Sequence, residues 1–311
     1  MAYLDVQFYS RVLGLSCTMG VILPEADQGI GVGESVWDGV TPLPVLYLLH
    51  GMSDNHTIWM RRTSLDRYAA GRKLAIVMPS AGRSYYSDQK YGLDYLTFIG
   101  EELPAICRRF FRISDRREEN FIAGLSMGGY GALKAALNYP DTFSYAASMS
   151  GVLDLEQLSD MRCYEKAGDE SFLEQLKAVD FEAYRSVRDY KLCFGSPEEF
   201  RGSSNDLCAL VDQLAAKNSL FPRLHLSIGT EDYLYGTNIT FRRKLDEHGV
   251  DYTYLEFPGT HEWSVWDKTI QDVLDWLPIE SSRPTGNGGA ERAAQNAAGS
   301  AVGDGKEGAG Q

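Results

Sequence analysis

The chain of 311 residues is long enough to bury a large core, as one sizeable domain or two small ones. Its formal net charge is −13, so the chain as a whole carries no excess of basic side chains to neutralise phosphates. We therefore exclude nucleic acid as an expected partner and regard polyanionic substrates as disfavoured. No apolar run approaches the roughly 18–20 residues that span a membrane, and the first residues suggest a strand instead of a leader peptide.

The five cysteines, at positions 17, 107, 163, 193 and 208, are odd in number and lack the spacing of metal ligands. They are typical of reduced thiols in a cytoplasmic protein. We therefore expect a cytoplasmic location, with neither a disulfide framework nor a metal site.

The first half of the chain predicts strands and helices in alternation. Two β-type segments near the start, Gln7–Gly14 and Ser16–Leu23, are close enough to pair as an antiparallel hairpin. A loop rich in glycine and acidic residues follows. The next predicted elements are a buried strand at Val45–Leu49, a helix at 58–71 and a second buried strand at Leu74–Met78. An aromatic polar loop at Ser84–Tyr95 then leads into a helix at Tyr95–Phe110. Pro104 must occupy an early turn of the last helix or bend it.

The second half continues the alternation with one interruption. The apolar run Phe121–Ala123 predicts a strand, and a helix follows it as far as Asn138. From Gly151 to about Ser203 the pattern is irregular and mostly polar, after which Ser204 or Asn205 caps a helix to Lys217. The other predicted elements are strands at Phe143–Met149, Leu224–Ile228 and Tyr252–Phe257, and helices at Asn238–His248 and His261–Leu277.

This order of elements across residues 43–278 indicates an α/β fold, a mostly parallel sheet with helices on both faces and the N-terminal antiparallel hairpin at one edge. We expect one domain over residues 1–280. Its segment 151–203 is longer than a crossover needs, and either folds over the site as a small cap or runs as a surface excursion. Residues 281–311 are rich in glycine and alanine and are predicted to be disordered, because they can bury too little apolar surface.

The stretch Gly124-Leu-Ser-Met-Gly128 places glycine two residues on either side of Ser126, the G-x-S-x-G spacing. Where a strand turns sharply into a helix, side chains at the flanking positions would collide, and glycine avoids the collision. The bare pattern also occurs in ordinary tight turns. Here a strand precedes it and an apolar helical stripe follows it, which is the context of a nucleophile elbow, so Ser126 is the predicted nucleophile.

A serine hydroxyl needs a base, and the base needs an orienting acid. Ligands of an open α/β sheet bind at the carboxyl ends of its strands, and His261 alone among the five histidines follows a late strand at the start of the last helix. Capping that helix is its alternative role. Asp232 follows the strand at 224–228 and completes the order Ser, Asp, His of α/β-hydrolases. Glu231 is its nearest rival and Asp251 a distant one, and spacing alone leaves the choice open.

The tetrahedral intermediate of acyl transfer carries a negative oxygen that needs preorganised N–H donors. One donor should be the backbone N–H of Met127, directly after the nucleophile. The other should come from the turn His50-Gly51-Met52, where glycine permits close approach, and we assign it to the N–H of Met52. Alternatively, His50-Gly51 merely ends a strand.

Four stretches of the chain together carry a family resemblance. They are Tyr47–His56 with Trp59, Gly124–Gly131, Gly229–Asp232 and His261–Trp266. They resemble the esterase D-type α/β-hydrolases, most closely the bacterial tributyrin esterase and acetylesterase group, with feruloyl esterases and S-formylglutathione hydrolases as relatives. The resemblance covers about residues 2–280 and implies an α/β-hydrolase fold, a triad of Ser126, Asp232 and His261, and no metal or cofactor. Ser53-Asp54 stands where S-formylglutathione hydrolases usually carry Thr-Cys, which argues against a glutathione thioester substrate.

Several aromatic residues bear on the substrate. Trp59, Tyr85 and Tyr86 lie in or near loops that follow strands, so they could line an acyl or aromatic pocket, although packing in the core is equally consistent. Trp263 and Trp266 are close in the last helix, and we expect them to be core residues that hold His261.

These features predict a serine carboxylesterase for short acyl esters, acetyl to butyryl, with O-acetylated sugars among the candidates. A feruloyl esterase and an acyltransferase of the mycolyltransferase type are alternative enzymes. A non-catalytic binding protein is disfavoured, because every triad position is filled. The expected partner is a small-molecule ester, with no nucleic acid and no membrane, and the sequence predicts neither the natural substrate nor the oligomeric state.

Overall fold

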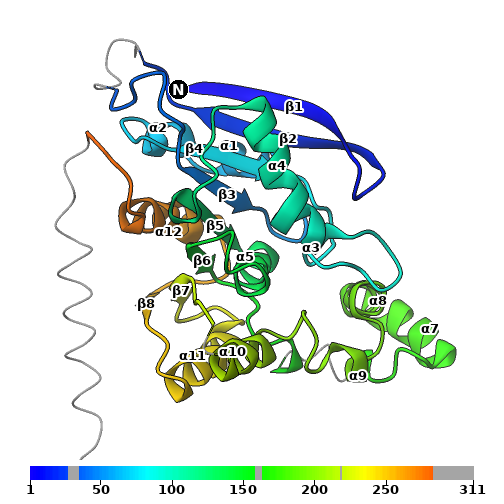
Figure 1. The fold of residues 1–311 in the computed structure, drawn as a ribbon. Helices are drawn as coiled ribbons and strands as arrows, with labels where there is room; N and C mark the ends of the chain where they lie inside the picture. The colour runs from blue at the N-terminus through cyan, green and yellow to red at the C-terminus, as the bar shows by residue number, and fades with distance from the viewer. Residues whose placement is uncertain (27–34, 158–162, 218, 283–311) are drawn as a thin grey trace, which may run out of the picture.

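The computed structural model describes residues 1–26, 35–157, 163–217 and 219–282, and within them eight strands form one sheet (Figure 1). The order across the sheet is β1-β2-β4-β3-β5-β6-β7-β8. The strands are β1 (Ala2–Ser10), β2 (Leu15–Leu23), β3 (Val45–Leu49), β4 (Ala75–Pro79), β5 (Asn120–Leu125), β6 (Tyr145–Met149), β7 (Arg223–Gly229) and β8 (Tyr252–Phe257).

The pairing of the strands confirms the predicted sheet, although the first hairpin strand, predicted at Gln7–Gly14, is β1 at Ala2–Ser10, and residues 11–14 form the turn. β1 and β2 form an antiparallel hairpin in which Ser10 pairs with Leu15, and β2 pairs antiparallel with β4. From β4 to β8 all neighbouring strands are parallel. The carboxyl ends of six strands therefore meet at one edge of the sheet, where the loops after β3, β5, β7 and β8 carry the predicted site residues.

Helices cover both faces of the sheet. They are α1 (Ile58–Arg62), α2 (Leu65–Ala69), α3 (Tyr95–Thr97), α4 (Leu103–Phe110), α5 (Met127–Asn138), α7 (Glu170–Val179), α8 (Phe181–Phe194), α9 (Pro197–Phe200), α10 (Leu207–Ala216), α11 (Tyr235–Glu247) and α12 (Trp263–Trp276), with a π-helical turn η1 (Phe98–Glu102) and 3-10 turns η2 (Arg117–Glu119) and η3 (Leu155–Gln157). None of the helices in the described chain is long and apolar enough to cross a membrane.

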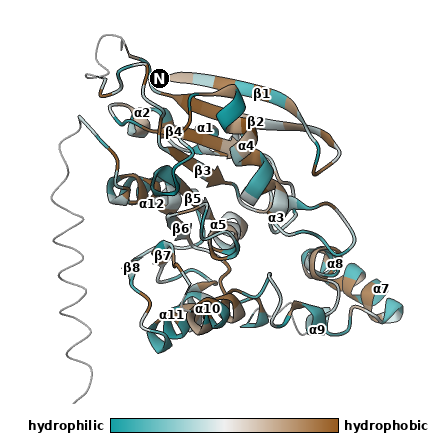
Figure 2. Cartoon of the chain, in the orientation of Figure 1, coloured by the Kyte–Doolittle hydropathy of each residue, from teal (hydrophilic) through white to brown (hydrophobic). Residues whose placement is uncertain are grey.

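The two faces of the sheet build two separate cores. Alternate residues of β3 point to opposite sides, and all are buried, as expected of a central parallel strand. Tyr47 belongs to the core shared with α4, α5, α10 and α11, whereas Leu46 and Leu48 belong to the core shared with α1, α2 and α12. Figure 2 shows β2, β3 and β4 in hydrophobic colours and α11 mostly in hydrophilic ones.

Two of the predicted helices are interrupted. The helix predicted at 58–71 is split into α1 and α2 at Thr63, whose hydroxyl donates to the carbonyl of Trp59 and accepts from the N–H of Leu65 at 3.1 Å. Such local bonds of a threonine compete with the helical ones. The helix predicted at 95–110 passes through the η1 turn, and Pro104 stands in the first turn of α4, where its missing N–H costs nothing.

The segment 151–203 corrects the prediction of an irregular pattern, because it holds α7, α8 and α9. Asp169 and Asp180 cap α7 and α8 by accepting hydrogen bonds from backbone N–H groups three residues on. Likewise Asp206, and neither Ser204 nor Asn205, caps α10. Figure 1 shows α7, α8 and α9 beyond the carboxyl ends of the strands, at the lower right.

Contacts with the loop that follows β4 attach this helical segment to the sheet. Arg83 forms an ion pair with Asp189 of α8, and Lys90 with Glu199 at 2.8 Å. The ring of Tyr85 packs against rings of α8 at centroid distances of 5.5 Å. The segment predicted to be disordered lies outside the described residues, except for Ser281 and Ser282.

Candidate active site

The turn between β5 and α5 holds Ser126 in a conformation that few side chains adopt. Its φ is 53° and its ψ is −121°, and it stands directly before α5. The N–H of Ser126 donates to the carbonyl of Met149 at 2.9 Å, and its own carbonyl accepts from Tyr130 at 3.1 Å. A non-glycine residue held in such a region costs on the order of 1–3 kcal/mol, and residues of this kind cluster at functional sites.

The glycines on either side of Ser126 have the steric role predicted for them. A Cβ added at Gly124 would lie 2.3 Å from the carbonyl oxygen of Gly128, and one added at Gly128 would lie 2.6 Å from that of His50. Any side chain at these positions would therefore push α5 away from β5 and from the turn after β3. The predicted collision across the elbow is confirmed.

Hydrogen bonds bring the three predicted triad residues together. Nε2 of His261 lies 2.9 Å from Oγ of Ser126, and Nδ1 of His261 lies 2.9 Å from Oδ2 of Asp232. Because an ionised carboxylate only accepts, Nδ1 carries the proton, and Nε2 is left to accept from the serine hydroxyl. The side chain of His261 is 16% exposed and that of Asp232 is fully buried, whereas Ser126 is half-buried. Solvent therefore reaches the serine and the histidine but not the acid.

The neighbouring carboxylates have different positions and different contacts. The second oxygen of Asp232 accepts the N–H of Leu234 at 2.9 Å. The carboxylate of Glu231 accepts the N–H of Gly259 at 2.5 Å, and this bond is the main reason why its pKa lies below the ordinary value. Asp251 is exposed before β8, at the other end of the strand. Asp232 is therefore the carboxylate that contacts the histidine, a choice that spacing left open.

Glu231 instead joins the two loops that carry Asp232 and His261. Its N–H donates to the carbonyl of Gly259 at 3.1 Å while its carboxylate accepts the N–H of the same residue. A Cβ added at Gly229 would lie 2.1 Å from the Gly259 carbonyl oxygen, so glycine is required for this approach. The close contact of the two loops sets His261 beside the acid.

Aromatic rings contact the imidazole of His261. The buried ring of Trp266 meets it nearly edge-on, with centroids 4.9 Å apart, and Trp263 packs on Trp266 at 5.2 Å. These contacts agree with the prediction that the two tryptophans hold His261. A third ring, that of Tyr233, lies 4.8 Å from the imidazole and is 73% exposed. Sequence reasoning missed Tyr233, although its position directly after Asp232 could have indicated it.

The turn His50-Gly51-Met52 lies against the nucleophile. A Cβ added at Gly51 would be 2.8 Å from Leu125 and 3.9 Å from the Cβ of Ser126. The N–H groups of Met52 and Met127, the two predicted oxyanion donors, have no backbone acceptor within the described chain. Both are therefore available to a ligand at the positions where the sequence assigned them.

His50 holds this turn in place. Its Nε2 accepts the N–H of Ala81 at 2.9 Å, so its Nδ1 carries the proton that faces the carbonyl of Gly51 at 2.6 Å. Burial lowers the pKa of His50 to about 4, and the ring stays neutral near pH 7. The hydroxyl of Tyr86 donates to the carbonyl of His50 at 2.9 Å and fixes the same turn from the other side.

The three aromatic residues predicted to line a substrate pocket are buried in the core instead. Trp59 is 0% exposed and its Nε1 donates to the carbonyl of Leu49 at 3.1 Å. Tyr86 is 0% and Tyr85 1% exposed. Their rings fill the space between the strand ends and the helices, so none of them presents a face to a substrate. The prediction is corrected in favour of packing, the alternative left open by the sequence.

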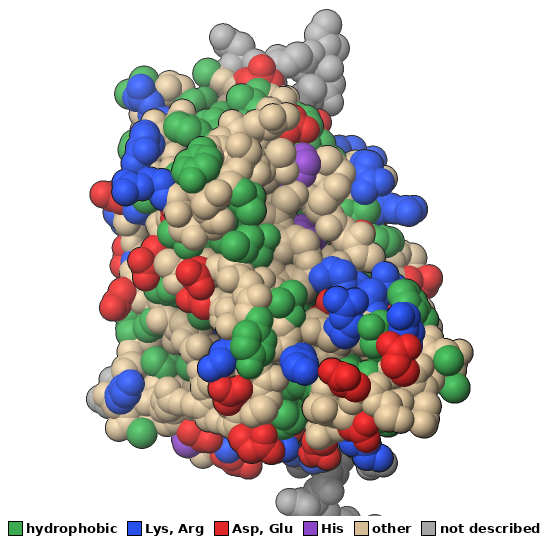
Figure 3. Space-filling view, turned by 90° about the vertical axis from the view of Figure 1, so that its right-hand side faces the viewer, with side chains coloured by type: hydrophobic (Ala, Val, Ile, Leu, Met, Phe, Trp, Pro, Cys, Tyr) green, Lys and Arg blue, Asp and Glu red, His purple; other side chains and the backbone are tan. Residues whose placement is uncertain are grey.

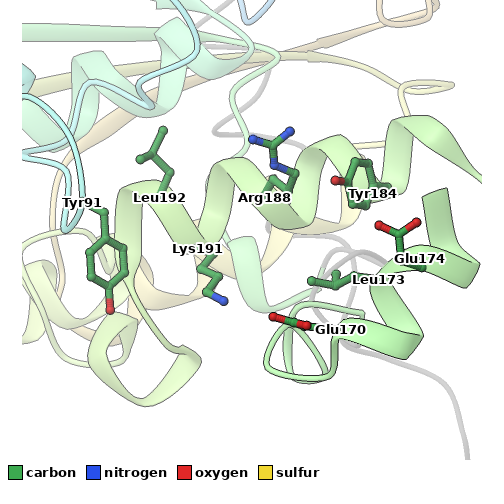
Figure 4. A pocket seen from close by; sticks show the side chains of 8 residues that line it. All are labelled: Tyr91, Glu170, Leu173, Glu174, Tyr184, Arg188, Lys191 and Leu192. Atoms are coloured by element: carbon green, nitrogen blue, oxygen red, sulfur yellow. The ribbon is translucent and has the colours of Figure 1, made fainter.

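Two cavities lie away from the triad. One of about 480 Å³ is lined by α7, α8 and Tyr91, with Glu170, Arg188 and Lys191 around it (Figure 4). The other, of about 450 Å³, lies near Phe221 and His248. Neither includes Ser126, Asp232 or His261. In the described ranges no group of three or more His, Cys, Asp and Glu side chains is placed to hold a metal ion.

Charges of both signs are mixed on the face of the molecule seen in Figure 3. Lysine and arginine side chains gather near the centre right and at the upper left of this view, and acidic side chains lie mainly along the lower edge and the left side, so neither sign covers the whole face.

Comparisons with known proteins agree with this geometry. Residues 34–277 match the family described as "Putative esterase". The chain is 30% identical over 279 residues to an acetyl esterase of Caldicellulosiruptor saccharolyticus, covering 89% of this chain and 98% of that protein.

Solved structures with the same fold are also similar in sequence. A fluorophosphonate-binding serine hydrolase of Staphylococcus aureus superposes with a TM-score of 0.72 at 32% identity, and an S-formylglutathione hydrolase of the same species with 0.69 at 31%. Each comparison covers 89% of this chain and 98% of the other. The chain therefore belongs to this esterase family and is a carboxylic ester hydrolase of the α/β-hydrolase fold.

Proposed function

We propose that this esterase is a serine carboxylesterase that hydrolyses short-chain acyl esters, acetyl to butyryl, with Ser126 as nucleophile, His261 as base and Asp232 as orienting acid. One observation carries the proposal. The hydroxyl, the imidazole and the carboxylate form a continuous hydrogen-bonded chain, with 2.9 Å at each link, at a strained elbow. Such a chain converts a weak nucleophile into an effective one.

In the first half of the reaction, Oγ of Ser126 attacks the ester carbonyl carbon while Nε2 of His261 takes the hydroxyl proton. The carbonyl oxygen becomes negative and accepts hydrogen bonds from the N–H groups of Met127 and Met52. The bond to the alcohol oxygen then breaks, and His261 returns the proton to that oxygen. An alcohol leaves and an acyl-serine remains.

In the second half, a water molecule replaces the alcohol. His261 takes a proton from it, the hydroxide adds to the acyl carbon, and the acid leaves as Ser126 recovers its proton. Asp232 never accepts that proton. Its buried carboxylate, held by the N–H of Leu234, keeps the Nδ1 proton of His261 in place and stabilises the imidazolium.

The preference for short acyl groups is supported by the similarity to an acetyl esterase and by the burial of Trp59, Tyr85 and Tyr86. These three rings are at most 1% exposed, so they do not form an aromatic slot for the acyl group. A feruloyl group, flat and long, needs such a slot. The small acyl groups need little more than the space beside the oxyanion donors.

The test is hydrolysis of an ester series from acetyl to octanoyl, with a feruloyl ester included, by the wild type and by Ser126→Ala. We expect the highest kcat/KM between acetyl and butyryl, and a loss of at least about 10³-fold in turnover for Ser126→Ala. Ser150→Ala is the matched control, because Ser150 is also a serine at positive φ, 49°, and lies outside the triad. Equal loss in both variants, or a preference for octanoyl or feruloyl esters, would reject the proposal.

Acyl transfer to an alcohol is the alternative reaction of the same acyl-serine. It is distinguished by adding glycerol or a free sugar at millimolar concentration and measuring the ratio of acylated alcohol to free acid. We expect the free acid to dominate. A predominance of acylated alcohol would make the protein a transferase.

We also propose a cytoplasmic location. The five cysteines are free, and three of them are buried. Free thiols of this kind are typical of a reducing compartment.

A further inference from the structure

The ring of Tyr233 is in an uncommon position for a large aromatic side chain. It is 73% exposed, yet its centroid lies only 4.8 Å from that of the His261 imidazole. Trp266, which contacts the same imidazole, is only 6% exposed. One ring therefore supports the histidine from within the core, and the other leaves most of its surface open to whatever lies beside the histidine.

The reaction geometry says which part of the substrate lies there. Nε2 of His261 returns a proton to the oxygen of the leaving alcohol, so this oxygen must come within about 2.6–3.2 Å of Nε2. The carbonyl oxygen is held on the other side of the scissile carbon, by the N–H groups of Met52 and Met127. A group attached to the alcohol oxygen thus lies beside the imidazole of His261, and the ring of Tyr233 borders the same imidazole.

We propose that Tyr233 is a stacking platform for the alcohol part of the ester, and that it selects alcohols built on a six-membered ring with an apolar face. This inference rests on the proposed function. The phenol ring of tyrosine offers a rigid apolar face at low entropic cost. The C–H face of a pyranose sugar has this chemistry, and so has a phenyl ring. An ethyl or methyl alcohol is too small to use the platform.

The experiment holds the acyl group constant and varies the alcohol. Ethyl acetate, phenyl acetate and a mono-O-acetylated methyl glucopyranoside are compared with the wild type, Tyr233→Ala and Tyr233→Phe. Each variant is compared with the wild type on the same ester, so differences in the intrinsic reactivity of the esters cancel. Tyr9→Ala is the matched control, because Tyr9 is 62% exposed and lies on β1 at the far edge of the sheet.

For Tyr233→Ala we expect KM to rise and kcat/KM to fall about five- to ten-fold with the two ring-bearing esters, and to stay within two-fold with ethyl acetate. Tyr233→Phe should retain the wild-type value with phenyl acetate. A loss with the sugar ester alone, or with the phenyl ester alone, assigns the platform to that source of ring.

Two outcomes overturn the inference. An equal fall in kcat with all three esters would mean that Tyr233 only positions His261, and no change with any ester would mean that its face is unused. Failure of the proposed function has a different signature, since the wild type would then hydrolyse none of the esters or Ser126→Ala would remain active.

Discussion

The backbone at Ser126 has φ at 53° and ψ at −121°, a conformation that glycine adopts without strain and serine does not. The surrounding hydrogen bonds and the contact of Gly124 with Gly128 impose this conformation. The strain presents Oγ to His261 at the start of α5. The strained backbone at Ser126 therefore lowers the stability of the fold, at the position where the reaction needs an accessible hydroxyl.

We therefore expect Ser126→Gly to raise the melting temperature by a few degrees, because glycine relieves a strain of about 1 kcal/mol or more. Ester turnover should be abolished in the same protein. Thermal unfolding and acetate ester hydrolysis measure the two effects. A fall of several degrees would show that the serine contributes more to the fold than its conformation costs.

The adjacent acids Glu231 and Asp232 give a second expectation at this scale. Asp232→Asn should fold normally and lose up to about 10⁴-fold in turnover, because an amide favours the wrong tautomer of His261. Glu231→Gln keeps an oxygen that can accept the Gly259 N–H, so its turnover should fall only a few-fold. Steady-state kinetics of both variants test the assignment of Asp232 as the orienting acid. A more severe loss of turnover in Glu231→Gln than in Asp232→Asn would assign that role to Glu231 instead.

At the scale of elements, helix α5 joins the nucleophile to the loop after β4 and to the chain that leads into α10. Ser126 stands at its start, and two turns further on the buried ammonium of Lys134 donates to the carbonyl of Tyr85 at 2.7 Å, to Ser87 at 2.5 Å and to Asn205 at 3.1 Å. The ammonium also lies 4.6 Å from the ring of Tyr130. Lys134 therefore connects the elbow helix, the loop after β4 and the start of the chain leading into α10.

Burial lowers the pKa of Lys134 to about 7, while the nearby Cys193 and Asp88 oppose the shift. The ordinary pKa near 10.5 applies in the unfolded chain, which thus binds more protons than the folded one between pH 7 and 10.5. The contribution of Lys134 to stability therefore increases as the pH rises through this window, and is lost as the pH falls through 7.

We expect the free energy of unfolding of the wild type, minus that of Lys134→Met, to grow by about 2 kcal/mol between pH 7 and 9. Urea denaturation at the two pH values measures it. Lys268→Met, at an exposed position of α12, is the control and should show no such slope. A difference that is flat or falls with pH would mean that the lysine titrates normally in the folded chain.

At the scale of the whole molecule, the sheet could be predicted because the sequence pattern that indicates each strand lies within the strand itself. Val45–Leu49 is a continuous apolar run, buried on both faces in the structure as such a run requires. The nucleophile elbow could also be predicted from the sequence. Its spacing places glycine at positions 124 and 128, where any side chain would collide with backbone across the turn. Asp232, His261 and Ser126 follow three different strands, and a parallel sheet brings such residues to one edge.

Other features depend on contacts between distant segments, which local sequence does not encode. The helices α7 and α8 were missed because α7 buries no side chain and α8 buries only four, Val187, Tyr190, Cys193 and Phe194, among polar neighbours. Their attachment comes partly from pairs such as Arg83 with Asp189. Trp59 and Tyr86 were predicted to line a pocket, but tertiary packing buries both side chains in the core. The contact of Tyr233 with His261 arises only when the loops after β7 and β8 meet. Whether 151–203 covers the site stays a prediction.

The central claim is that hydrolysis passes through a covalent bond to Ser126. An alkyl fluorophosphonate tests it directly, because the nucleophile displaces fluoride and keeps a stable tetrahedral phosphonyl group that imitates the intermediate. Intact-mass and peptide mass spectrometry should find one adduct per chain, on Ser126, with activity lost in proportion and no adduct on Ser126→Ala. A stoichiometric adduct on another residue, or full esterase activity after complete labelling of Ser126, would contradict the account.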